Sequence, residues 1–99
     1  MPSIDISQRT NVPAEEARRR LEGFQTEIEE RFGLVPEWTS PTEARVSRTG
    51  ASGKLRIDPT RILVHIDLSF ALTPLRGRIE SELRRRLAEL FADQLRSDR

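Results

Sequence analysis

The sequence contains no cysteine and only one histidine, His65, and these two absences limit its chemistry. Without cysteine the chain has no disulfides, no thiolate metal ligands and no thiol nucleophiles, which also fits a reducing compartment. A metal site would have to be built almost entirely from carboxylates, and the adjacent glutamate pairs at 15–16 and 29–30 point in different directions on a helix. We therefore expect no metal site and no cofactor.

Long hydrophobic runs are also missing. No apolar stretch approaches the roughly 20 residues that a membrane-spanning helix needs. The first residues, Met1 to Asp5, lack the basic region and apolar stretch of a signal peptide. We expect a cytoplasmic protein without a transmembrane segment.

An excess of one charge is missing as well. The chain has 17 basic and 16 acidic residues and a net charge of +1. A dedicated binder of nucleic acid or of an anionic membrane usually carries a clear basic excess, so we expect no nucleic-acid partner. The arginine runs at 18–20 and 84–86 have glutamates three and four residues away, which is typical of a solvated helix surface with ion pairs.

The length of 99 residues fits one domain over residues 1–99. We expect an ordered core from about residue 3 to residue 93, and fraying at residues 94–99. A chain of this size buries roughly 65% of its unfolded surface, so its core is modest.

Two amphipathic helices are predicted by apolar residues that recur at spacings of three and four. The first helix starts near Pro13, which suits a first helical position, and ends where Gly33 is expected to form a left-handed cap. The second helix is expected to start at Thr73 and Pro74, as N-cap and first helical residue. Its stripe carries Leu75, Ile79, Leu83, Leu87, Leu90 and Phe91.

Strands are predicted by alternation of apolar and polar residues. Residues 3–7 form a short strand before the first helix, and residues 34–39 form an edge strand because Pro36 cannot donate to a central ladder. Further strands are expected at 43–47, 54–58 and 62–69. We expect residues 50–53 to be the connecting loop between two of them.

The predicted order β-α-β-β-β-β-α indicates an α+β fold: a single domain with an antiparallel sheet and two amphipathic helices packed on one face. The other sheet face should be polar. The layout is loosely like the helix-grip folds, an analogy that implies no ligand by itself. Strand edges in such a sheet can pair across a two-fold axis, so this chain can form a homodimer by that route.

Several short blocks in chain order resemble the bacterial polyhydroxyalkanoic acid system protein family, whose members are described as granule-region proteins. The resemblance runs from about Ile4 to Phe91. Its blocks are Ile4-Asp5-Ile6, Glu15-Glu16-Ala17-Arg18, Phe32-Gly33-Leu34 with Trp38 after it, Gly53-Lys54-Leu55, and Val64-His65-Ile66-Asp67-Leu68 followed by Phe70, Leu72, Pro74 and Leu75-Arg76-Gly77-Arg78-Ile79-Glu80. The last block is the most specific. The chain departs from the family pattern at Ser69 and near Pro13.

The resemblance implies a link to polyhydroxyalkanoate storage and supplies no catalytic motif. We expect a non-catalytic accessory protein that binds the granule surface or granule-associated proteins. The alternative is a small helix-grip-like module that holds an acyl or hydroxyacyl ligand between the sheet and the C-terminal helix.

One arrangement of residues suggests an enzyme. His65, Asp67 and Ser69 share the polar face of one predicted strand, and these three residue types are those of a hydrolase triad. Same-face neighbours stand roughly 6.6–7 Å apart at the backbone, however, and a triad needs linked hydrogen bonds and an oxyanion hole. No Gly-x-Ser-x-Gly turn occurs either. We therefore expect no catalytic residues.

Partner contacts are expected instead at Trp38, Phe70, Leu72 and Arg76. Trp38 and the bridge 70–72 would form an apolar patch if they were exposed together. Burial beneath the two helices is the competing expectation for them.

Overall fold

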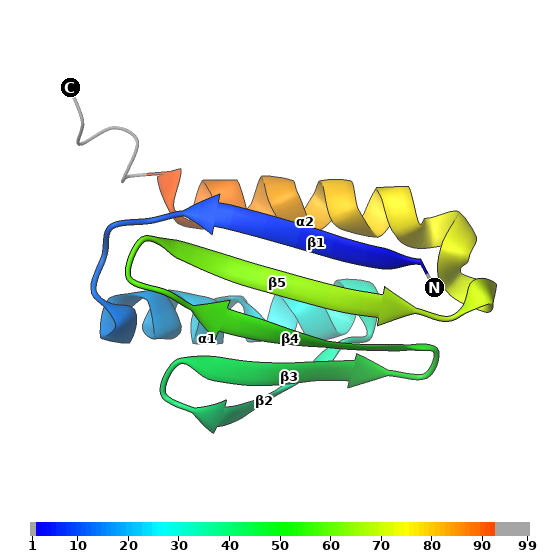
Figure 1. Cartoon of the computed structure of the whole chain (residues 1–99), viewed down its shortest axis with the longest axis horizontal. Coiled ribbons are helices and arrows are strands. Elements are labelled where there is room, and N and C mark those ends of the chain that lie inside the picture. The colour runs from blue at the N-terminus through cyan, green and yellow to red at the C-terminus, as the bar shows by residue number, and fades with distance from the viewer. Residues whose placement is uncertain (1, 93–99) are drawn as a thin grey trace.

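Five strands and two main helices follow one another in the predicted order in the computed structural model, which describes residues 2–92 (Figure 1). The expectations for residues 93–99 lie outside the described part of the chain. The strands are β1 (Ser3–Arg9), β2 (Val35–Ser40), β3 (Glu43–Arg48), β4 (Ala51–Ile57) and β5 (Arg61–Leu68). The helices are α1 (Ala14–Phe32), the short 3-10 helix η1 (Phe70–Leu75) and α2 (Arg76–Leu90).

Helix α1 ends where the sequence predicts and begins one residue after the predicted first position, because Pro13 is still extended, with ψ 153°. Pro13 precedes it with φ −58°, and Glu15 and Glu16 lie in the first turn, where negative charge suits the helix dipole. Gly33 ends the helix with φ 70°, and its N–H donates to Glu29 O at 2.9 Å. This left-handed conformation costs glycine little, which explains why a glycine stands there.

The strands form one fully antiparallel sheet in the order β1-β5-β4-β3-β2. The meander of β2 to β5 is built from neighbours in the sequence. β1 instead pairs with β5, from Ser3 opposite Asp67 to Arg9 opposite Arg61. The sheet edges are therefore β1 and β2, and the edge position expected for the Pro36 strand is confirmed.

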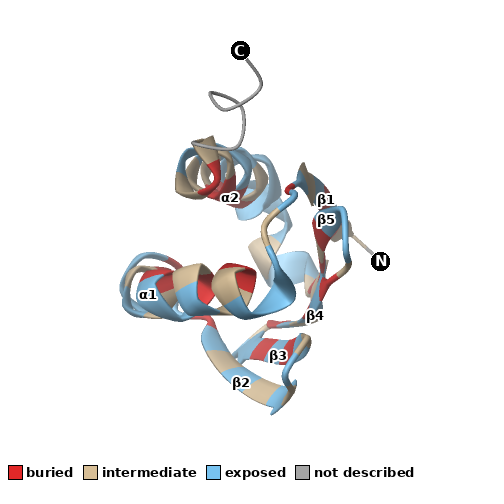
Figure 2. Ribbon diagram, turned by 90° about the vertical axis from the view of Figure 1, so that its left-hand side faces the viewer, coloured by how far each residue is buried: buried red, intermediate tan, exposed pale blue. Residues whose placement is uncertain are grey.

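Both helices cover the same face of the sheet, as predicted (Figure 2). The core between these layers comprises 21 buried apolar side chains, including Ile62 and Phe91, which are fully buried. Alternation along the strands places the polar side chains on the opposite face. No helix within residues 2–92 is long and apolar enough to cross a membrane.

The expected loop at residues 50–53 is wrong, because β4 already starts at Ala51. Only Thr49 and Gly50 form the turn. Gly53 therefore lies inside the sheet, where a Cβ atom would be 2.2 Å from His65 O and 2.8 Å from Ile66 Cα. The glycine permits a close approach of two strands here and does not mark a loop.

The start expected for the second helix is also wrong. Thr73 and Pro74 lie within η1, and α2 begins at Arg76 after Leu75. The Thr73 hydroxyl donates to Ser69 O at 3.3 Å, back toward the end of β5, and so does not cap α2. The bridge after β5 is thus about two turns of tighter helix that change the direction of the chain.

Candidate functional site

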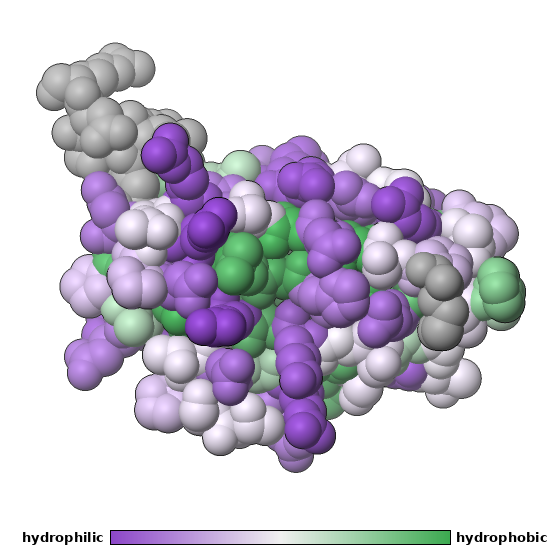
Figure 3. All heavy atoms as spheres, in the orientation of Figure 1, coloured by the Kyte–Doolittle hydropathy of each residue, from purple (hydrophilic) through white to green (hydrophobic). Residues whose placement is uncertain are grey.

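The sheet face that no helix covers displays a row of charged side chains across all five strands. By register, Asp5 lies opposite His65, His65 opposite Lys54, Lys54 opposite Arg45, and Arg45 opposite Glu37. In Figure 3 this face is mostly hydrophilic, with a hydrophobic patch near its centre. A single alternating polar position on each strand therefore assembles an extended charged surface.

His65 is held between two carboxylates on this face. Its Nδ1 lies 2.6 Å from Asp5 Oδ1, across the β1–β5 pair, and its Nε2 lies 3.1 Å from Asp67 Oδ1 on the same strand. The hydrogen bond to Asp5 raises the pKa of His65 above its ordinary value, and Asp67 adds to that increase. The site thus favours a positively charged imidazole that is already engaged on both nitrogens.

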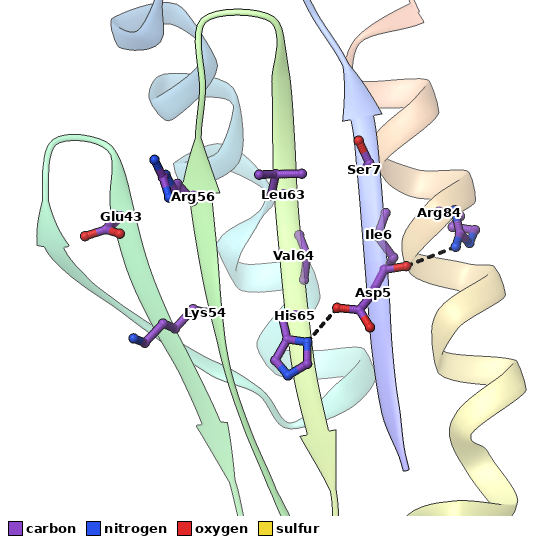
Figure 4. A pocket seen from close by; sticks show the side chains of 10 residues that line it. All are labelled: Asp5, Ile6, Ser7, Glu43, Lys54, Arg56, Leu63, Val64, His65 and Arg84. Carbon is purple, nitrogen blue, oxygen red and sulfur yellow. Dashed lines mark hydrogen bonds and ion pairs between the residues drawn. The ribbon is translucent and has the colours of Figure 1, made fainter. Parts of the chain in front are cut away.

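A shallow hollow of about 540 Å³ lies on the same face, over β1, β5 and β4 (Figure 4). Leu63 points into it from β5, and Arg84 reaches it from α2, where its guanidinium donates to Asp5 O at 3.0 Å. The other charged side chains that line it are Asp5, Glu43, Lys54, Arg56 and His65. A second hollow of about 420 Å³ continues over Arg45, Ser52 and Lys54. Both are open depressions, which suit surface contacts better than enclosure of a small substrate.

The structure separates Ser69 from the other two residues of the suspected triad. β5 ends at Leu68, and the Ser69 hydroxyl lies against the turn at Gly50, 3.0 Å from where a Cβ of that glycine would be. His65 and Asp67 do meet through their side chains, which backbone spacing alone did not predict. Both nitrogens of His65 face carboxylates, so neither is placed to activate a serine.

A second candidate surface is the segment after β5. Phe70 is 81% exposed and Leu75 is 42% exposed, although both are large apolar side chains. Leu72 between them is half-buried, packs against the core and contacts the turn at Gly50. Leu72 thus anchors η1 while Phe70 and Leu75 face outward. We call Phe70, Leu72 and Leu75 the η1 corner.

The four residues expected to contact a partner do not form one patch. Phe70 and Leu72 lie in η1, and Arg76 starts α2 directly after it, where its Nε donates to Ser3 O at 2.8 Å. Trp38 is half-buried on β2, under Arg18, whose guanidinium carbon is 4.9 Å from the ring centroid. Three strand intervals, or roughly 14 Å, separate β2 from β5. Trp38 therefore belongs to the helix-covered side of the sheet edge.

Three features of these surfaces were not predicted from the sequence: the Asp5–His65 contact, the row through Lys54 and Arg45, and the exposure of Leu75. The first two depend on which strands pair, and β1 finds its partner far along the chain. Strand alternation already placed Asp5, Lys54 and Arg45 on polar positions, but it gave no strand order. Within residues 2–92, no group of three or more histidine, aspartate or glutamate side chains is arranged to hold a metal ion.

Comparison with known proteins identifies a family. The model of a protein family described as "Putative polyhydroxyalkanoic acid system protein" matches residues 4–91, which extend from β1 to the end of α2. No curated protein and no solved structure gives a significant match.

Proposed function

Because the chain belongs to the family of polyhydroxyalkanoic acid system proteins, we propose that it is a non-catalytic accessory protein of the bacterial polyhydroxyalkanoate storage system. In this proposal it acts in the cytoplasm and binds the granule surface or a granule-associated protein. The observation that carries the proposal is the outward-facing phenylalanine of the η1 corner, Phe70.

The η1 corner combines exposure with a fixed position, and both properties favour a contact surface. Phe70 makes no contribution to the core at 81% exposure, so its apolar surface is available for burial against something else. Burying a phenylalanine or leucine side chain stabilises a complex by roughly 1.5–3 kcal/mol. Leu72 holds the segment to the protein body, which reduces the entropy lost when the corner binds.

Arg76 supports this arrangement from the other side. Its guanidinium is bound to Ser3 O and lies 3.6 Å from Glu80 Oε1, so it joins the start of α2 to β1. We assign Arg76 the role of orienting the η1 corner, with part of its side chain exposed beside the corner. Next to it, a groove of about 330 Å³ is lined by Leu75, Arg78 and residues at the end of α1. This groove gives a protein partner a recess beside the apolar corner.

The alternative of an acyl ligand between the sheet and α2 receives no support from the packing. The space left between the layers is about 30 Å³ and is lined by apolar residues of α1, α2 and the sheet. That volume corresponds to about one water molecule. An acyl chain would require the two layers to separate, and we do not favour this function.

A non-catalytic role is supported by the placement of the titratable side chains. His65 is occupied by Asp5 and Asp67, and Ser69 is turned toward Gly50.

The test is fractionation of a polymer-accumulating culture that expresses the wild-type chain or the double variant Phe70→Ser/Leu75→Ser. We expect the wild type on washed granules and the double variant at least about tenfold depleted from them, because two apolar contacts are lost. The matched control is Val35→Ser, which removes a 54% exposed apolar side chain from β2, and β2 lies three strands away from β5, the strand that leads into η1. A wild type that stays wholly in the soluble fraction, or equal depletion of both variants, would contradict the proposal.

A further inference from the structure

The cations of this protein are distributed unevenly between its two layers. Eight arginines of the helices lie next to a carboxylate: Arg18, Arg19, Arg20, Arg31, Arg76, Arg84, Arg85 and Arg86. Four cations of the open sheet face, Arg9, Arg61, Lys54 and Arg45, have no ion pair with any described residue. Apart from Arg78, the arginines of the helical layer thus lie next to carboxylates of that layer, whereas these four cations of the open face do not.

The unpaired cations also lie opposite one another. Arg9 is the register partner of Arg61, and Lys54 is the register partner of both Arg45 and His65. Like charges directly opposite on neighbouring strands have Cβ atoms about 5 Å apart and destabilise a sheet. Glu37 lies opposite Arg45 in register, but the two form no ion pair. Such a cost is consistent with a face that meets external negative charge.

Carboxylates border these cations and restrict the kind of anion that fits. Asp5 and Glu37 end the central row, Asp67 lies beside His65, and Glu43 lies opposite Arg56. A nucleic-acid backbone or an anionic bilayer brings a continuous negative surface, which would meet these acids as well as the cations. A protein surface with carboxylates at discrete positions can avoid them.

An apolar side chain stands among the charges. Leu63 is half-buried on β5 and points into the hollow between Ser7 and Arg56, its register partners (Figure 4). An apolar centre within a polar rim is the usual anatomy of a protein–protein interface. The face is about 20 Å by 20 Å, or roughly 400 Å², which is half of what a stable interface buries on each partner.

From these observations we propose that the open sheet face is a second interaction surface, which binds an acidic segment of a partner protein with carboxylates placed over Lys54, Arg45 and the Arg9–Arg61 pair. Leu63 contacts an apolar side chain of the same segment. The small area and the exposed charges make the complex weak and sensitive to salt. The surface lies on a different side of the protein from the η1 corner and does not depend on it, so the chain can bind two partners at once.

The experiment uses the full chain labelled with ¹⁵N and, as the probe, a peptide in which glutamate alternates with serine around one central leucine. We expect saturable amide shifts confined to β1, β3, β4 and β5, and an affinity that weakens by about tenfold or more between about 20 mM and about 300 mM salt. Lys54→Gln/Arg61→Gln should weaken binding by at least about tenfold, since each substitution removes one charge contact with the peptide. Both side chains are exposed, so thermal unfolding should change little.

The matched control is Arg19→Gln/Arg85→Gln, which removes the same net charge from exposed helix positions. We expect this variant to bind like the wild type. Three results would overturn the proposal. They are an absence of localised amide shifts, an equal loss of peptide affinity in the two double variants, and tighter binding of a single-stranded oligonucleotide at the same salt. Phe70→Ser/Leu75→Ser should keep its peptide affinity, so a failed granule assay and a failed peptide assay remain separate results.

Discussion

At the scale of single residues, His65 is the side chain whose environment most clearly alters its chemistry. Two strands contribute to that environment, since Asp5 comes from β1 and Asp67 from β5 itself. The raised pKa means that the folded protein holds the imidazolium more tightly than the unfolded chain does. His65 therefore links the pairing of β1 with β5 to pH.

This link predicts how stability varies with pH. Because the folded pKa of His65 is raised, its stabilising contribution is fully present below the unfolded pKa of about 6.5 and is lost as pH rises through the folded pKa. We expect the urea midpoint to fall more between about pH 6 and about pH 8 in the wild type than in His65→Gln. The difference should be small because the side chain is half exposed.

An NMR titration of the imidazole gives the direct measurement. Asp5→Asn should lower the pKa of His65 more than Asp67→Asn does, because the hydrogen bond to Asp5 is the largest cause of the shift. A titration midpoint at or below the ordinary histidine value in the wild type would show that the carboxylates do not hold the ring as described.

At the scale of secondary structure, β4 contains a position that cannot accept a larger residue without a shift of the strands. Gly53 has no room for a side chain, since a Cβ would lie 2.2 Å from the backbone oxygen of His65. Backbone atoms cannot move aside as a flexible side chain can, so the strand pair itself would have to shift. The close pairing of β4 with β5 therefore requires a residue without a Cβ atom at position 53.

We predict that Gly53→Ala destabilises the fold by at least about 2 kcal/mol through this overlap. Gly23→Ala is the matched control, because a Cβ there meets nothing within 4 Å and Gly23 lies inside α1. That substitution should stabilise the protein by about 0.5–1 kcal/mol, since alanine favours the helix. Chemical denaturation of both variants provides the comparison, and a near-neutral Gly53→Ala would disprove the close approach.

Elements with a strong local pattern could be predicted from the sequence, and those set by distant contacts could not. The apolar period from Ala17 to Phe32 and the cap at Gly33 placed α1 correctly. Gly53 was assigned to a loop because glycine usually signals a turn, whereas here it allows two strands to approach. The exposure of Phe70 depends on the direction in which η1 leaves β5, and no local signal encodes that direction.

The candidate surfaces were predictable to a similar extent. Strand alternation placed Lys54, His65 and Asp67 on a polar face, and the structure places them there. Their neighbours depend on the strand order, in which β1 joins β5 across about 60 residues of chain. The Asp5–His65 bond and the Arg9–Arg61 pair follow only from that order.

At the scale of the whole molecule, the two sheet edges are shielded by different means. Two backbone oxygens of β1, those of Ser3 and Asp5, accept hydrogen bonds from Arg76 and Arg84 of α2. β2 carries Pro36, which has no N–H to donate, and an irregular register between Trp38 and Ser40. Shielded edges disfavour pairing with another sheet, which bears on the homodimer that the sequence left open.

We predict that the arginines keep β1 from pairing with a second copy. Arg76→Ala/Arg84→Ala should increase the population of dimers and larger species in size-exclusion chromatography with light scattering, because it frees two acceptors on a strand edge. Arg19→Ala/Arg85→Ala removes equal charge away from the edge and should behave like the wild type. A wild-type dimer that the first variant abolishes would mean that these arginines support an interface instead of blocking one.

The pairing of the first strand with the last has a consequence for how the chain folds during synthesis. β1 leaves the ribosome before its partner β5, which is not synthesised until about 50 residues later. At ordinary translation rates this delay lasts roughly 3–10 s. Until then Ile4 and Ile6, both buried in the finished protein, have no sheet to pack on. The local meander of β2 to β5 can form first, with low loop-closure cost, and β1 then completes the sheet against β5 as its final strand.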